Sequence, residues 1–251
     1  MLVELLDFFS DGYGPLRVFD YLSFRAIFAT LTALLVSLIL GPRFINKMQA
    51  IEVGQVIREK GPATHLSKKG TPTMGGTLIL ASIFISTILW GDLENRYLWV
   101  ALGVTILFGA LGWVDDLYKL RYESSKGLSP LAKLFWQSLI ALTAVIFLFY
   151  SSENISETSF IVPFFKDAII PMSPFLFIFT GMFVLVGSSN AVNLTDGLDG
   201  LAILPSVLIG GALGLIAYSM GNQLVSDYLY LPFLHLRLDL KWLLPLALLS
   251  E

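Results

Sequence analysis

Long apolar runs separated by short polar segments dominate this chain. Six runs approach the roughly 20 residues that a helix needs to cross a bilayer. They cover Leu22 to Leu40, Met74 to Trp90, Tyr97 to Val114, Leu134 to Tyr150, Pro171 to Gly187 and Gly200 to Met220, and a seventh runs from near Leu238 to Glu251. The runs are apolar on all sides, which favours helices over the alternating strands of a barrel. The pattern predicts an all-α, polytopic transmembrane helical bundle with six complete spans and a partial seventh.

Composition supports a membrane protein. Hydrophobic residues make up 55% of the chain and charged residues only 14%, against roughly 25% charged in a soluble domain. Residues 1–251 are therefore expected to form a single integral membrane domain. The absence of cysteine excludes disulfides and thiolate metal sites in this chain. The net charge of -3 is too small to indicate a partner, and we expect no nucleic acid to bind.

The basic residues predict the orientation of the spans. Ten of the sixteen Lys and Arg residues lie in the segments Gly41 to Thr73 and Asp115 to Lys133, and basic flanks are retained in the cytoplasm. These two segments and Ser188 to Asp199 are thus expected on the cytoplasmic face, with the N-terminus outside. The first 20 residues lack a basic start and contain the acids Glu4, Asp7 and Asp11, so we do not expect a cleavable signal peptide.

Two adjacent acids, Asp115 and Asp116, follow the third apolar run. A carboxylate next to hydrocarbon is costly and suggests a function. The alternative is a solvated helix end, although a helix C-terminus disfavours carboxylates. Adjacent residues point about 100° apart on a helix, so different partners and different roles are expected for the two acids.

A second polar cluster joins the fifth and sixth runs. The segment Asn190 to Gly200 holds Asn190, Asn193, Asp196 and Asp199. The two aspartates would share a helix face, since residues three apart are neighbours. The alternative is that Thr195 or Asp196 caps the sixth span. Capping explains one acid but not the whole cluster, so a site is favoured.

Basic and glycine-rich residues supply complementary chemistry. Lys68 and Lys69 lie before Gly75 and Gly76 at the start of the second run, where backbone N–H groups and ammonium groups form an anion site. The alternative for these lysines, and for Lys119, Lys126 and Lys133, is a purely topological role. Four acids with these lysines on one face predict a metal-assisted site for a phosphorylated substrate.

Six segments together carry a family resemblance. They are Gly54–Arg58 (GQVIR), Gly61–His65 (GPATH), Lys69–Gly76 (KGTPTMGG), Val114–Asp116 (VDD), Val162–Lys166 (VPFFK) and Asn190–Leu201 (NAVNLTDGLDGL). Taken together they resemble phospho-N-acetylmuramoyl-pentapeptide transferase, the MraY family, of the polyprenyl-phosphate N-acetylhexosamine-1-phosphate transferase superfamily. The similarity extends from the first span to about Phe233.

This resemblance implies a reaction and its partners. Phospho-MurNAc-pentapeptide would pass from UDP-MurNAc-pentapeptide to undecaprenyl phosphate, forming lipid I and UMP for peptidoglycan biosynthesis, with Mg²⁺ as cofactor. It implies a multi-pass protein of the bacterial cytoplasmic membrane with its active site on the cytoplasmic face. A homodimer is left open.

The family's roles carry over residue by residue. The resemblance implies catalytic roles for Asp115, Asp116 and Asp199, with Asp115 and Asp116 also as metal ligands. It implies substrate-binding roles for Lys68, Thr73, Asn190, Asn193 and Asp196.

The resemblance also implies a longer protein, of which this chain is the N-terminal two-thirds. A further aspartate loop and a histidine-rich loop are expected beyond this sequence, so the chain alone is expected to be inactive. Two alternative functions are a polyprenyl-phosphate GlcNAc-1-phosphate transferase and a membrane transporter with a cation site on the cytoplasmic face.

Overall fold

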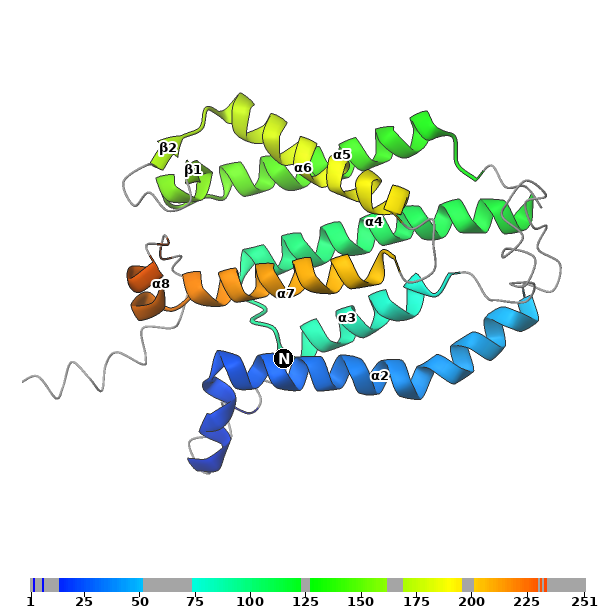
Figure 1. Ribbon diagram of the computed structural model, residues 1–251, viewed down its shortest axis with the longest axis horizontal. Helices are drawn as coiled ribbons and strands as arrows, with labels where there is room; N and C mark the ends of the chain where they lie inside the picture. The colour runs from blue at the N-terminus through cyan, green and yellow to red at the C-terminus, as the bar shows by residue number, and fades with distance from the viewer. Residues whose placement is uncertain are drawn as a thin grey trace, which may run out of the picture. The chain divides into compact units, whose positions relative to one another are not determined.

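The structure, a computed structural model (Figure 1), describes residues 14–51, 74–122, 127–161, 169–195 and 201–229, with positions 2, 6, 231 and 233. Helices account for nearly all of it. In chain order the elements are η1 (Gly14–Asp20), α2 (Leu22–Ile51), α3 (Gly76–Trp90), α4 (Arg96–Arg121), α5 (Pro130–Tyr150), η3 (Ile155–Thr158), β1 (Ser159–Ile161), β2 (Ile169–Pro171), α6 (Pro174–Thr195), α7 (Ile203–Met220) and α8 (Gln223–Leu229).

The predicted helical membrane fold is confirmed. Most of each of the six complete apolar runs lies in a helix, and five of these helices are long and apolar enough to cross a membrane. The sixth, α3, has 15 residues and so spans about 22 Å at 1.5 Å per residue, less than the roughly 30 Å hydrocarbon core. The predicted seventh run lies outside the described residues.

One element departs from the all-α prediction. Between α5 and α6, strands β1 and β2 pair antiparallel, with Phe160 opposite Ile170. The prediction had begun the fifth span at Pro171, but Pro171 ends β2 and α6 begins at Pro174. Proline lacks an N–H, so it is tolerated at the end of an edge strand and at the first turn of a helix.

The chain divides into two compact units, residues 1–140 and 141–251. In the first unit, polar side chains join α2 to α3. The hydroxyls of Ser37 and Ser82 lie 2.9 Å apart, and the Trp90 indole N–H donates to the Thr32 hydroxyl at 2.9 Å. Such bonds satisfy polar groups between helices where no water is present.

Aromatic rings pack together at the end of the same helix pair that holds Trp90. Phe19 from η1 stacks on Trp90 from α3 at 5.7 Å between ring centroids, and Phe28 from α2 lies 5.3 Å from the same indole. The opposite half of α2 bends in Figure 1, and this helix contains Pro42. A proline inside a helix removes one hydrogen bond and kinks the axis.

In the second unit, α5 packs on α6 through a close approach at Gly181. A Cβ built on Gly181 would lie 2.8 Å from both methyl groups of Val145, and Val145 is 3% exposed. The Phe149 and Phe177 rings, 5.6 Å apart, extend the contact. A small residue therefore sets the separation of the two helices.

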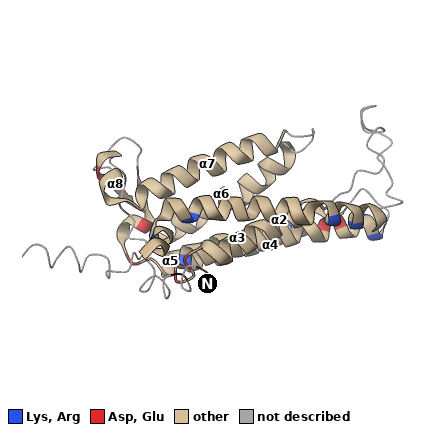
Figure 2. Cartoon of the chain, turned by 90° about the horizontal axis from the view of Figure 1, so that it is seen from below, with Lys and Arg blue, Asp and Glu red and all other residues tan. Residues whose placement is uncertain are grey.

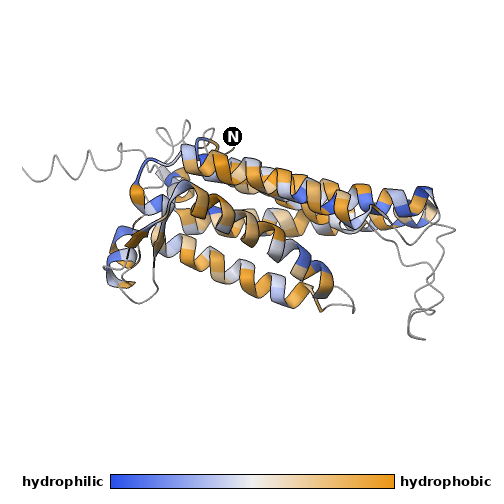
Figure 3. Cartoon of the chain, turned by 90° about the horizontal axis from the view of Figure 1, so that it is seen from above, coloured by the Kyte–Doolittle hydropathy of each residue, from blue (hydrophilic) through white to orange (hydrophobic). Residues whose placement is uncertain are grey.

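The surface of the helices is apolar along their length. Charged residues gather towards helix ends (Figure 2), and hydrophobic residues cover the stretches between them (Figure 3). None of the residues of α7 is buried. So large an exposed apolar surface needs a lipid environment, and the chain is a multi-pass membrane protein.

We predict that Ser129 and Asn154, which precede and follow α5, lie on opposite sides of the membrane, Ser129 on the cytoplasmic side. In this cysteine-free chain, Asn154→Cys should react with an impermeant maleimide in intact cells, and Ser129→Cys only after permeabilisation. Labelling of Ser129→Cys in intact cells would contradict the basic-residue rule for this chain.

We predict that Gly181→Ala lowers the free energy of unfolding in detergent by about 1–3 kcal/mol, the usual cost of overpacking. Val145 is β-branched and cannot rotate its methyl groups away cheaply. Gly187→Ala on the same helix, where a Cβ meets nothing within 4 Å, is the matched control. Adding Val145→Ala to Gly181→Ala should recover part of the loss; equal stability of the two single variants would contradict the prediction.

Candidate functional site

The aspartate pair lies within α4 and not at its end. The sequence pattern ended this span at Val114, but the helix continues to Arg121 and carries Lys119 and Arg121 in its last turn. Asp115 and Asp116 are therefore more than one turn from the C-terminus. The expectation of two carboxylates at a helix end was wrong, because backbone hydrogen bonding continues beyond the apolar run and basic residues occupy the negative end of the dipole.

Lys119 bridges the two aspartates. Its Nζ lies 2.7 Å from Asp115 Oδ2 and 2.9 Å from Asp116 Oδ1. The expectation of different partners is thus corrected: residues three and four positions apart share a helix face, so one lysine reaches both acids. Lys133, at the start of α5, adds a further positive charge to the surroundings of Asp115.

The two carboxylates differ in their remaining environment. Asp115 Oδ1 accepts a 2.7 Å hydrogen bond from the backbone N–H of Leu128, in the segment that leads into α5. The Asp115 side chain is 15% exposed and that of Asp116 36% exposed. Within the described part of the chain, Asp116 Oδ2 accepts no hydrogen bond. Asp116 is therefore the acid with an oxygen free for a ligand.

An open groove lies beside Asp116, between the start of α3 and the second half of α4. Its volume is about 350 Å³, and its lining residues are Met74, Gly76, Thr77, Ile79, Leu80, Gly109, Gly112, Trp113 and Asp116. Three of them are glycines, and a Cβ on Gly109 would run into the Leu80 side chain. Small residues thus allow α3 to approach α4 closely and bring Asp116 against the residues that begin α3.

The chain enters α3 through a left-handed residue. Met74 has a φ of +63°, an uncommon conformation for a residue with a side chain. Its carbonyl accepts from Thr77 N–H at 3.0 Å, which closes the first turn. The groove is therefore bordered by a local turn that the sequence pattern did not predict.

The other predicted site residues divide into two groups. Asn190 and Asn193 lie in the last turns of α6, where Asn190 Nδ2 donates to Val186 O at 2.8 Å and Asn193 is exposed. Both belong to the second unit, described separately from the aspartate pair. Lys68, Thr73, Asp196 and Asp199 lie outside the described residues.

The capping alternative can be compared with the structure at Thr195. Helix α7 begins at Ile203 with Ala202 as its N-cap, whereas Thr195 is the last residue of α6. Thr195 is therefore not the N-cap of α7, and Asp196 lies outside the described residues.

A magnesium ion is compatible with the donors at the pair. Mg²⁺ in phosphate-transfer sites is held by one or two carboxylates together with substrate phosphates, and Asp116 offers an unengaged oxygen. Among the described residues there is no group of three or more His, Asp or Glu side chains placed to hold a metal. The fit is therefore to a site that substrate oxygens would complete.

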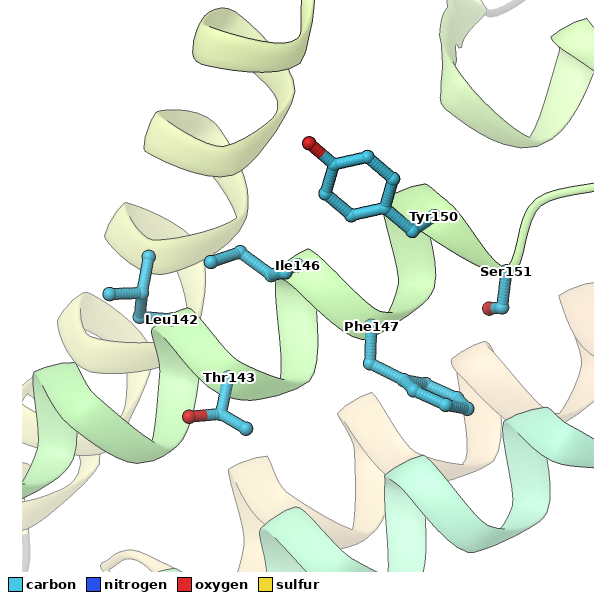
Figure 4. Close-up of a pocket in the computed structure, with 6 residues that line it drawn as sticks. All are labelled: Leu142, Thr143, Ile146, Phe147, Tyr150 and Ser151. Atoms are coloured by element: carbon cyan, nitrogen blue, oxygen red, sulfur yellow. The ribbon is translucent and has the colours of Figure 1, made fainter.

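A second pocket, on α5, is larger than the groove beside Asp116 but is lined by uncharged residues. It measures about 540 Å³ and is lined by Leu142, Thr143, Ile146, Phe147, Tyr150 and Ser151 (Figure 4). These side chains come from a single helix and the residue after it, and none of them is charged. Its lining has no group suited to phosphate chemistry.

Sequence reasoning missed two contributors to the site. Lys119 was interpreted only as a possible topological residue, although its spacing of three and four from the acids was a usable signal. The Leu128 backbone N–H could not be identified from the sequence, because every residue except proline has a backbone N–H.

Comparison with known families agrees with this geometry. The family model described as glycosyl transferase family 4 matches residues 98–236, more than half of the chain. The phospho-N-acetylmuramoyl-pentapeptide-transferase signature 1 matches residues 68–80. The groove places the described end of that signature, from Met74 to Leu80, against Asp116 of α4. The chain belongs to glycosyl transferase family 4, as a member of the MraY type.

Proposed function

We propose that this member of the polyprenyl-phosphate sugar-1-phosphate transferases moves phospho-MurNAc-pentapeptide from UDP-MurNAc-pentapeptide to undecaprenyl phosphate. The observation that carries the proposal is the groove in which the muramoyl-pentapeptide signature faces Asp116. The products would be lipid I and UMP, and the site would lie on the cytoplasmic face.

The reaction joins two anions. A phosphate oxygen of the lipid attacks the phosphorus that bears the sugar; the new P–O bond forms as the bond to UMP breaks, and UMP leaves. No proton transfer is required, because a lipid phosphate is already largely ionised near neutral pH. The chain must therefore hold the two substrates in line and offset their repulsion, which are the main tasks in phosphoryl transfer.

The aspartate pair sets the local charge. Two carboxylates and the Lys119 ammonium leave a net charge of about -1, and two like charges 4 Å apart repel by about 4 kcal/mol at an effective dielectric constant of 20. Phosphates would thus be repelled without an added cation. Mg²⁺, when bound, would supply that charge, with Asp116 as the carboxylate best placed to hold it.

Nucleotide binding is the proposed role of the polar residues at the end of α6. Asn190 and Asn193 lie near the C-terminal end of α6, directly before the segment that holds Asp196 and Asp199. We propose that these residues, with Lys68 and Thr73, bind the UDP moiety, and that Asp199 acts with the aspartate pair. Amide groups can both donate to phosphate oxygens and accept from a base or ribose hydroxyl.

We predict that, in the full-length protein, Asp116→Asn lowers transfer by about 10² to 10³-fold, the loss typical for one transition-state electrostatic contact. Purified protein in detergent, radiolabelled UDP-MurNAc-pentapeptide, undecaprenyl phosphate and a Mg²⁺ titration provide the assay. Asp227→Asn, at an exposed position on α8, is the matched control and should not change the rate.

Two outcomes would contradict the proposal. If Asp116→Asn transfers the substrate at the same rate as the unsubstituted protein, Asp116 has no role in the reaction. Formation of lipid-linked product from UDP-GlcNAc but not from UDP-MurNAc-pentapeptide would assign the GlcNAc-1-phosphate specificity instead.

A further inference from the structure

The segment between α4 and α5 approaches Asp115 so closely that only glycine fits there. Gly127 has a φ of +50°, a conformation that glycine adopts at little cost. A Cβ built on it would lie 2.9 Å from Asp115 Cγ and 2.9 Å from Lys119 Cε, and closer still to Asp115 Oδ1. Both the backbone conformation and the available space at this position therefore require a residue without a side chain.

The close approach of Gly127 places the backbone N–H of Leu128 next to the Asp115 carboxylate. Leu128 N–H donates to Asp115 Oδ1 at 2.7 Å, while Lys119 engages Asp115 Oδ2 at 2.7 Å. Both oxygens of Asp115 are thus occupied by the protein. Hydrogen bonds to a charged acceptor are short and strong, so this carboxylate is held from two sides.

Lys119 links the position of the Asp115 carboxylate to that of Asp116. The Lys119 Nζ that is held by Asp115 also contacts Asp116 Oδ1 at 2.9 Å. A displacement of Asp115 would therefore move the ammonium group and with it the side chain of Asp116, the acid that lines the groove.

We propose that Gly127 and Leu128 form a positioning element for the aspartate pair. Asp115 is then a positioning residue that ties the α4–α5 segment and Lys119 together, and Asp116 is the carboxylate that meets the ligand. The identity of the ligand that meets Asp116 rests on the proposed function. The positioning of the two acids can be tested without assuming that function.

The first test measures the Leu128 amide. Labelling with ¹³C-carbonyl glycine and ¹⁵N leucine selects the four Gly–Leu pairs of the chain, and Leu128→Ile assigns the signal of interest. Asp115→Ala should shift this amide proton upfield and speed its exchange with solvent about tenfold or more, as loss of a charge-assisted hydrogen bond requires. Gly127→Ala, in which ¹³C-carbonyl alanine replaces ¹³C-carbonyl glycine as the label before Leu128, should show the same upfield shift and faster exchange although Asp115 is intact.

Matched variants separate positioning from general damage. Asp116→Ala removes a Lys119 contact but not the Leu128 bond, and Gly103→Ala adds a Cβ that meets nothing within 4 Å; both should leave the Leu128 signal unchanged. If the Leu128 amide proton has the same chemical shift and exchange rate in Asp115→Ala as in the unsubstituted protein, the proposal is overturned. If Gly127→Ala does not fold, Asp115→Asn, which keeps an acceptor oxygen but loses the charge, should shift the amide part of the way.

The second test uses the transfer assay. Gly127→Ala should lower kcat by about 10²-fold, as small misplacements do, with a KM for the nucleotide substrate close to that of Gly103→Ala. If Gly127→Ala shifts the Leu128 amide proton but leaves kcat unchanged, the positioning role is also overturned. Absence of transfer by the unsubstituted full-length protein would count against the proposed function alone, since the amide measurement still decides the positioning.

Discussion

The bridge from Lys119 to Asp115 and Asp116 is the interaction on which the candidate site depends. Two adjacent carboxylates next to a membrane span would repel each other and favour water over their present positions. One ammonium group within 3 Å of both offsets much of that repulsion. It also leaves the pair with a net negative charge, which is suited to a divalent cation and unsuited to a bare phosphate.

Glycines then determine what surrounds the bridge. Gly109 lets α3 approach α4, so that the groove beside Asp116 is bordered by the signature residues. Gly127 lets the segment before α5 reach Asp115. At Gly109 the absent side chain leaves room for the Leu80 side chain, and at Gly127 it leaves room for the Asp115 carboxylate.

These contacts separate the two acids by role. Asp115 is engaged on both oxygens and mostly buried, whereas Asp116 is more exposed and borders the groove. The family resemblance implies catalytic and metal-binding roles for both acids, and their positions on the helix predict that the two roles differ. The asymmetry supports one acid that holds the site together and one that meets the ligand.

The sequence by itself determined the helical membrane fold, because an apolar run of span length is a local property and a helix satisfies its own backbone in lipid. It also identified Asp115 and Asp116 as candidates from their unfavourable position. It misplaced the end of α4, since helical hydrogen bonding continues through Asp115 to Arg121 whatever the polarity of the side chains. Only the tertiary structure decided that Leu128 N–H meets Asp115 and that Met74 to Leu80 face Asp116. Those contacts arise from the geometry of turns and helix packing, which joins residues distant in sequence and has no periodic signature in the chain.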